Sequence, residues 1–354
     1  MGAWYATRED VKSALDWAET SRSNARVDQA IEAASRWIEG FLHRRFYPEL
    51  ATRYFDFPDQ YARPWRLWLD DSELISLTSI SSGGTVLDPT TVLLEPNRSG
   101  PPYNRVELRI DTNSAFGGGQ TTQRDVTITG LWGYSADDIA VTTAASAINS
   151  TATTLLVASS AGIGVGQLLR VGTERLTVTE RTMAPTGQTL QQPLDALQKT
   201  VTVAVTDGTA FALDEVLLVD SERMLVVDIA GDQLTVKRAW DGSVLATHTG
   251  SAIYAPRKLT VTRGVLGTAA AAINQDATVY RWDVPGPVRT LCIAEALVTQ
   301  LQQSSGYART TGVGSSARQV GGGTVSKTQY GLSIESLREQ VYTSHGRKAR
   351  VRAV

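Results

Sequence analysis

Two short stretches of this chain read as neighbouring parts of one small module, although residues 135–283 separate them. Residues 126–134, VTITGLWGY, alternate in the manner of a half-buried strand. Residues 284–301, VPGPVRTLCIAEALVTQL, begin with prolines and continue as a helix. The segment between them is patterned as β-strands. The chain is therefore expected to consist of a small core module interrupted by a larger β-rich insertion.

The N-terminal region predicts two helices followed by a small antiparallel sheet. Thr7 and Asp10 have the spacing of a capping box, and apolar residues follow them at helical intervals. A longer helix is expected over 25–45, because its apolar residues fall on one stripe. After it, short alternating runs are separated by glycine and proline turns. One such run, 106–110, is expected to bury Ile110 with its other apolar residues.

The inserted segment, 139–282, loses the helical pattern and is dominated by Thr, Val, Ala and Gly. It contains an internal echo, in which 166–181 resembles 215–228 and 238–254 resembles 263–280. Related β-units that cannot bury their apolar faces alone pack together as barrels or sandwiches. The segment therefore predicts an all-β domain with an internal duplication.

The C-terminal region, 305–354, reads as an arm. Its first part is rich in Gly and Ser, which is typical of a flexible linker, and a short helix capped by Ser333 is expected to follow. Apolar residues of that helix and the cations of the tail are candidate contacts to a partner protein or to DNA phosphates. A solvated terminus is the alternative. The candidates are Ile334, Leu337, Val341, Arg347, Lys348, Arg350 and Arg352.

The fold class expected from these patterns is α+β. A small helical core carries an antiparallel sheet, a large all-β domain of barrel or sandwich type is inserted into it, and the arm follows. Excision of the inserted domain is expected to leave a folded core, because its two flanks should lie close together. The expected divisions are 1–138 for the first part of the core, 139–282 for the inserted domain, 283–304 for the core helix and 305–354 for the arm.

Catalytic and metal-binding patterns are scarce in the sequence. His43, His248 and His345 lack the spacing of metal ligands. The glycines of 162–166, GIGVG, are followed by a strand pattern and so favour a turn over a phosphate-binding loop. Cys292 lies among apolar residues of a predicted helix, which favours a buried thiol. We expect no enzyme, no cofactor and no metal.

Aromatic residues of the insert leave two readings open. Trp240 and Trp282 are candidate surface residues, and together with Tyr254 and Tyr280 they could form a platform that stacks on a sugar. Tyr254 and Tyr280 fall at equivalent positions of the echo, which favours a repeated role in the core.

Composition points to no particular partner. The formal net charge of −2 at pH 7 is too small to favour nucleic acid or an acidic surface. No apolar run reaches the roughly 18 residues of a membrane-spanning helix. The first residues lack the basic and then apolar pattern of a secretory signal. We therefore expect no membrane partner.

The order of these features resembles the head–tail connector (adaptor) proteins of long-tailed, mainly siphophage-type, bacteriophages. The resemblance covers 1–134 and 284–304. It rests on structural positions rather than on one decisive motif. The segments that carry it are AIEAASRWIEGFLHRRFYP (30–48), TRYFDFP (52–58), RLWLDD (66–71), VTITGLWGY and VPGPVRTLCIAEAL (284–297).

The resemblance implies a structural virion protein that forms a ring, usually a dodecamer, in the neck of the virion after assembly in the host cytoplasm. Such a ring docks beneath the portal, extends the DNA channel and offers a docking surface to the next neck or tail-completion protein. The arm would engage the portal, and non-specific contact with packaged double-stranded DNA is possible. The insert departs from small members of the family and is expected to project outward. A carbohydrate- or protein-binding tail or baseplate component is the alternative.

Overall fold

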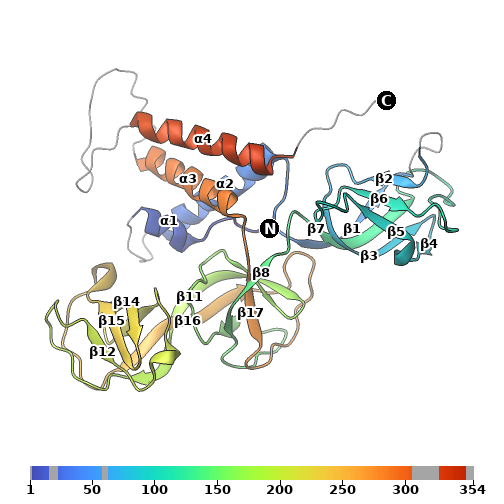
Figure 1. Ribbon diagram of the computed structural model, residues 1–354. Coiled ribbons are helices and arrows are strands. Elements are labelled where there is room, and N and C mark those ends of the chain that lie inside the picture. Colours follow the sequence, from blue (N-terminus) through green and yellow to red (C-terminus); the bar gives the residue numbers. More distant parts are fainter. Residues whose placement is uncertain (1, 16–22, 58–62, 305–326, 348–354) are drawn as a thin grey trace.

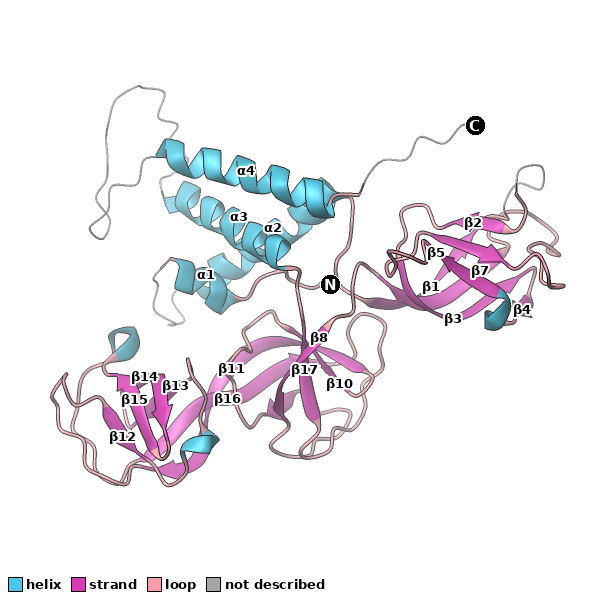
Figure 2. Cartoon of the chain, viewed as in Figure 1, coloured by secondary structure: helices cyan, strands magenta, loops and turns pink. Residues whose placement is uncertain are grey.

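The computed structural model describes residues 2–15, 23–57, 63–304 and 327–347, apart from the side chains of 304 and 327–333. These residues form an α+β fold in three parts: a helical bundle, a separate β lobe and a long β-insert (Figure 1). The predicted fold class is confirmed. Figure 2 shows that the α-helices gather in one body, while the strands and a few short 3-10 helices occupy the other two.

Both ends of the described chain build the helical bundle. In α1 the backbone N–H of Asp10 donates to the Thr7 hydroxyl, and the N–H of Thr7 donates to the Asp10 carboxylate, which confirms the capping box. Helix α2 ends at Leu42, before the predicted end, because His43 takes a left-handed conformation with φ 50°. The helices are α1 (Arg8–Ala14), α2 (Asn24–Leu42), α3 (Gly286–Ser304) and α4 (Lys327–His345).

The core of the bundle brings together residues that are far apart in the chain. Tyr134, from the end of the predicted 126–134 strand, and Val284, from the start of the 284–301 stretch, pack against this same core. Two residues of the insert, Leu168 and Trp282, are also buried in it. Its buried members from the helices include Val11, Val27, Ile31, Ile38, Leu42, Val288, Leu291, Cys292, Ala296 and Val341.

The β lobe has its own apolar core between two antiparallel sheets. Strand β6 ends at Leu108, so Ile110 lies beyond the sheet with 80% of its surface exposed, and the prediction that Ile110 is buried is wrong. One sheet has the order β1 (Glu49–Phe55), β7 (Val126–Trp132), β3 (Leu74–Ser82) and β4 (Thr85–Leu87). The other has the order β2 (Arg66–Trp68), β6 (Arg105–Leu108) and β5 (Val92–Glu95).

The insert consists of two β-units on one continuous antiparallel sheet. Strands β11 and β16 pair with each other and run through both units (Figure 1). We call 138–183 with 258–282 the proximal unit, and 184–257 the distal unit. The strands of the whole insert are β8 (Asp138–Thr143), β9 (Thr154–Leu156), β10 (Leu168–Val171), β11 (Glu174–Thr189), β12 (Thr202–Ala204), β13 (Val216–Val219), β14 (Glu222–Ala230), β15 (Gln233–Lys237), β16 (Ala252–Thr262) and β17 (Thr278–Trp282).

The two units repeat one strand pairing. In the proximal hairpin Val171 faces Glu174, and in the distal hairpin Val219 faces Glu222. The strand beside each hairpin is also placed alike, since Arg170 pairs with Tyr280 and Leu218 pairs with Tyr254. The echo in the sequence therefore corresponds to equivalent positions in two related β-units.

Each unit also buries one glutamate–arginine pair. In the distal unit Arg238 donates to both carboxylate oxygens of Glu222, at 2.7 and 2.8 Å. Arg263 makes the same two bonds to Glu174, both at 2.7 Å. Each carboxylate also accepts two backbone N–H groups from the loop after its arginine. These loops are held closed by the same four bonds in both units.

The proximal unit docks on the bundle through the GIGVG loop. The backbone N–H of Val165 donates to Glu9 at 2.7 Å, and the Val165 carbonyl accepts from Arg8 at 3.1 Å. A Cβ added to Gly164 or Gly166 would overlap Thr7 or the Trp4 ring, respectively. These glycines therefore allow close contact between the loop and the N-terminal segment.

Candidate functional site

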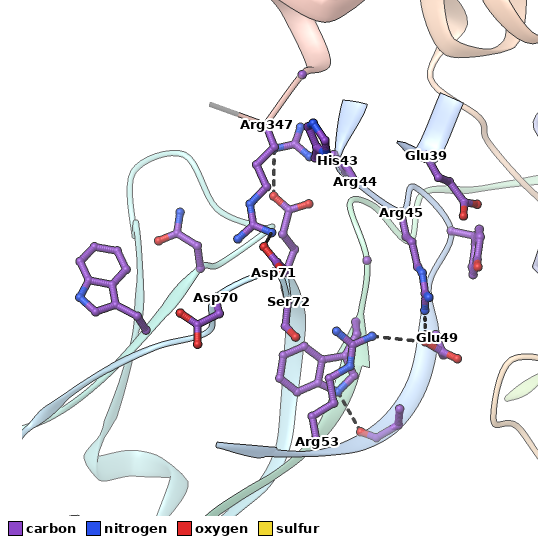
Figure 3. Close-up of a pocket in the computed structure, with 18 of the residues that line it drawn as sticks. Glu39, His43, Arg44, Arg45, Glu49, Arg53, Asp70, Asp71, Ser72 and Arg347 are labelled. Atoms are coloured by element: carbon purple, nitrogen blue, oxygen red, sulfur yellow. Dashed lines mark hydrogen bonds and ion pairs between the residues drawn. The ribbon is translucent and has the colours of Figure 1, made fainter. Parts of the chain in front are cut away.

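An arginine-rich groove lies where α2, the β lobe and the end of α4 meet (Figure 3). Its volume is about 2430 Å³, and both basic and acidic side chains line it. We call it the arginine groove. Its charged lining residues are Arg36, Arg44, Arg45, Arg53, Arg63, Arg66, Arg347, Glu39, Glu49, Asp70, Asp71 and Glu73.

The end of α2 sets the positions of two groove arginines. After His43 has stopped the helix, Phe46 and Tyr47 are anchored in the bundle core. The short segment between these points leaves Arg45 with 59% of its side chain exposed, whereas Arg44 turns back to the protein. The HRRFYP sequence thus presents a cation at the groove because the residues on both sides of it are fixed.

One side of the groove is closed by ion pairs. Arg44 contacts Glu73 at 2.9 Å and also donates to the carbonyl of His345 at 2.8 Å. Arg347 lies 3.5 Å from Asp71, and its backbone N–H donates to the Leu42 carbonyl. Burial raises the pKa of Glu73, and Arg44 opposes this effect. These contacts fasten the end of α4 to the β lobe.

The other side of the groove has cations that share carboxylates. Arg45 and Arg53 both approach the same oxygen of Glu49, at 3.6 and 3.3 Å. The guanidinium of Arg53 also lies 4.6 Å from the centre of the Trp132 ring. Burial lowers the pKa of Arg53; Glu49 opposes this shift and the charge of Arg45 adds to it. One carboxylate between two guanidinium groups leaves local positive charge, so this side can accept a further anionic group.

No protein-family model, curated protein or solved structure matches this chain. Within the residues that the structure describes, no helix combines the length and the apolar character that a membrane span requires. The resemblance to connector proteins therefore rests on the sequence segments quoted above.

The basic C-terminal candidates are only partly described by the structure. Arg347 reaches the groove, whereas Lys348, Arg350 and Arg352 fall outside the described residues. Helix α4 begins at Lys327, six residues before the predicted cap at Ser333. The Gly- and Ser-rich part of the arm, 305–326, also lies outside the description.

The apolar face of α4 is not a free surface. Ile334 and Val341 are buried, and Leu337 packs against the core of the bundle. This corrects their assignment as contacts for a portal protein or DNA. The reason is that α2 and α3 offer an apolar surface to the same helical stripe, which the sequence of α4 alone does not reveal.

The aromatic candidates of the insert differ in how far they are buried. Trp282 is buried in the bundle core, 6.0 Å from the Tyr5 ring, which corrects its assignment to the insert surface. Trp240 is half-buried in a short turn, with the Lys237 ammonium 5.6 Å from its ring centre. Tyr280 lies beneath Arg170, whereas Tyr254 is exposed and does not have the expected core role. A platform that joins Trp240 and Trp282 is therefore excluded.

Cys292 is a buried thiol, as predicted. Its sulfur lies 3.5 Å from the Ser35 hydroxyl inside the bundle. Burial raises the pKa of Cys292 to about 12, which keeps the thiol protonated at neutral pH.

Two groups of charged residues come together in the fold without a pattern in the sequence that predicts them. The groove arginines come from α2 and the segment after it, from β1, from β2 and the loop before it, and from the residues after α4. The HRR run at the end of a predicted helix was the one local signal. In the distal unit His248 lies between Asp220 and Glu222, at 2.7 and 2.9 Å. Their separation in the chain hides this contact from any spacing rule.

Proposed function

We propose that this chain is a structural virion protein, a head–tail connector whose copies form a ring beneath the portal of a phage. The observation that carries the proposal is that helices from the two ends of the described chain share one core. Helices α1 and α2 pack with α3 and α4, while the β lobe and the insert leave the bundle as separate bodies (Figure 1). Two of the five segments that resemble connector proteins, 30–48 and 284–297, lie mostly in these helices.

The ring would be joined through an exposed aromatic face of the bundle. Trp37 stacks on Phe41 with ring centres 4.9 Å apart, and Tyr342 packs against Phe41 at 5.5 Å. Trp37 and Tyr342 expose 39% and 46% of their surface. Aromatic side chains are enriched at protein interfaces, and a ring needs two different patches that fit each other. We assign the aromatic face, Trp37, Phe41 and Tyr342, to one of these patches.

The remaining parts have roles that follow from their attachment. The insert is held to α1 through Glu9, which contacts Val165 and Arg181, and in the ring it would project outward from the DNA channel. The C-terminal end would face the portal, and the basic residues that follow the Arg347–Asp71 pair, Lys348, Arg350 and Arg352, would meet DNA phosphates or acidic groups of the portal. The opposite surface of the ring would receive the next neck protein.

The proposal is tested by electron microscopy of the purified protein and of virion necks. We expect rings, and we expect Trp37→Glu with Tyr342→Glu to abolish them while helicity is retained. Val86→Glu is the matched control, because Val86 is an apolar residue with 73% exposure on the β lobe. A protein that stays monomeric and is absent from the neck would overturn the proposal.

A further inference from the structure

Strand β1 is an edge strand beside the arginine groove. Among the strands that the structure describes, the order β1-β7-β3-β4 gives it a neighbour on one side only. The N–H of Leu50 points away from β7, since it donates to the Leu266 carbonyl at 2.9 Å. In an antiparallel pair, alternate residues direct their N–H and C=O groups the same way. Thr52 and Tyr54 therefore present their backbone groups at the open edge.

The groove follows this edge. Its lining includes Ala51 and Arg53, which point to one face of β1, and Thr52, which points to the other. Because residues from both faces of β1 line the groove, the groove must run beside the strand rather than over one face. An extended segment placed there would meet the free backbone groups of β1.

The two faces of the edge differ in chemistry. On the face of Arg53 the guanidinium groups of Arg53 and Arg45 share Glu49. On the opposite face Leu50 and Tyr54 are exposed, Tyr54 by 59%. A strand added to β1 would point alternate side chains at these two faces. The complementary pattern is acidic residues on one face and apolar residues on the other.

We propose that the arginine groove binds an extended acidic segment of a partner protein, which adds to β1 as a further strand. Its backbone would bond to Thr52 and Tyr54, and its carboxylates would meet Arg45 and Arg53. Strand addition combines affinity from backbone hydrogen bonds with specificity from alternate side chains. This goes beyond the connector proposal, because the groove binds such a segment whether or not the protein forms a ring.

A peptide suits the groove better than a nucleic acid. The edge of β1 offers alternating N–H and C=O groups, which match a peptide backbone and not a chain of phosphates. The surrounding segment, 49–137, also contains twelve Asp and Glu against seven Lys and Arg. Such a surface disfavours a long chain of phosphates, whereas the local arginines attract the few carboxylates that a short strand presents on one face.

The test uses the full chain and three labelled probes, followed by fluorescence anisotropy. The probes are a blocked heptapeptide of alternating valine and glutamate, its valine–lysine counterpart, and a short oligothymidylate. We expect the glutamate peptide to bind and the other two to bind at least about tenfold more weakly, since one charge-assisted contact is worth about that factor. Tighter binding of the oligothymidylate, or no binding of the glutamate peptide, would overturn the proposal.

Two pairs of variants separate the charge from the strand edge. Arg45→Gln should weaken binding of the glutamate peptide about tenfold. Arg109→Gln, an exposed arginine of the same lobe outside the groove lining, should not change it. Thr52→Pro removes one outward N–H and should abolish binding of the glutamate peptide. Thr52→Val retains that N–H and should leave the binding unchanged.

Hydrogen exchange keeps the test decisive if Thr52→Pro fails to fold. In the native protein the amides of Thr52 and Tyr54 should gain protection when the glutamate peptide binds. Unchanged exchange at both amides in the presence of bound peptide would show that the peptide lies elsewhere, and strand addition would be rejected.

Discussion

Glu222 and Arg238 face each other at 2.7 Å in the interior of the distal unit, and neither side chain is exposed. Glu174 and Arg263 form the corresponding pair in the proximal unit. Each pair joins the second strand of a hairpin to a loop that follows it in the chain. A buried charge is costly unless it is paired and hydrogen-bonded. The stability of each unit therefore depends on both residues of its glutamate–arginine pair.

Breaking the distal pair should unfold the distal unit selectively. Glu222→Ala leaves the Arg238 guanidinium buried without its carboxylate, and we expect a loss of about 3–5 kcal/mol in the free energy of unfolding. Hydrogen exchange of β14 and β15 measures this loss locally. The control is Asp111→Ala, which breaks an exposed pair with Arg109 and should cost far less stability. Equal losses for the two variants would contradict the prediction.

The distal unit should also lose stability in acid. Burial alone would raise the pKa of Glu222, but hydrogen bonds from Arg238, His248 and two backbone N–H groups lower it to about 2. A lowered pKa stabilises the folded state at pH values above the ordinary 4.5 of a glutamate. This contribution should fall as the pH drops from there through about 2.

The comparison variant for the acid experiment is Glu222→Gln, which cannot titrate at this position. Hydrogen exchange of β14 between pH 5 and pH 2 should show a smaller loss of protection in this variant than in the native protein. If both proteins lose protection with the same slope, Glu222 is not the group responsible.

Docking of the insert on the bundle should depend on Gly166. Gly166→Ala places a Cβ against the Trp4 ring at a φ of +91°. Gly187→Ala also places an alanine beyond the usual left-handed region, at a φ of +78°, but its Cβ would meet open space. We expect the first variant to be less stable than the second by about 1–3 kcal/mol in thermal unfolding, since overpacking has this cost. The same melting temperature for both would show that the contact with Trp4 is dispensable.

The distal unit should be removable, whereas the whole insert should not. Thr182 and Lys258 are paired in β11 and β16, so an Asn-Gly turn can replace 183–257. We expect the remaining chain to keep its helical circular dichroism and its melting transition. Excision of 139–282 also removes Leu168 and Trp282 from the bundle core, and loss of a buried tryptophan alone costs about 3–5 kcal/mol.

This outcome would revise the expectation from the sequence that excision of 139–282 leaves a folded core. If both excised proteins retain the native helical transition, the contribution of Trp282 to the bundle is smaller than its burial indicates. If neither folds, the distal unit supports the proximal unit through more than the shared strands.

Features set by neighbours in the chain were predictable. The capping box of Thr7 and Asp10 spans three residues, and the apolar stripe of α2 repeats at the helical period. The echo within the insert was visible as well, because equivalent positions of two related β-units keep similar residues. The first two patterns lie within a short window of sequence, and the echo is a likeness between pairs of such windows.

Contacts between separate segments were not predictable from local pattern. Ile334 and Val341 have the spacing of an apolar helix face, but only α2 and α3 decide that this face is covered. Trp282 was equally compatible with a surface or a core position. The arginine groove unites side chains from four elements, and no window of the sequence contains them together.

The sequence by itself determined the α+β class, the helical stripes and the presence of two related β-units, because periodicity and turn residues act over a few positions. Only the tertiary structure decided which apolar faces are buried and which cations share carboxylates. Burial and charge pairing depend on the distance between side chains, and the fold brings Arg45, Glu49 and Arg53 to one groove while it carries Trp282 into the bundle. The same local patterns permit either outcome until the segments are packed together.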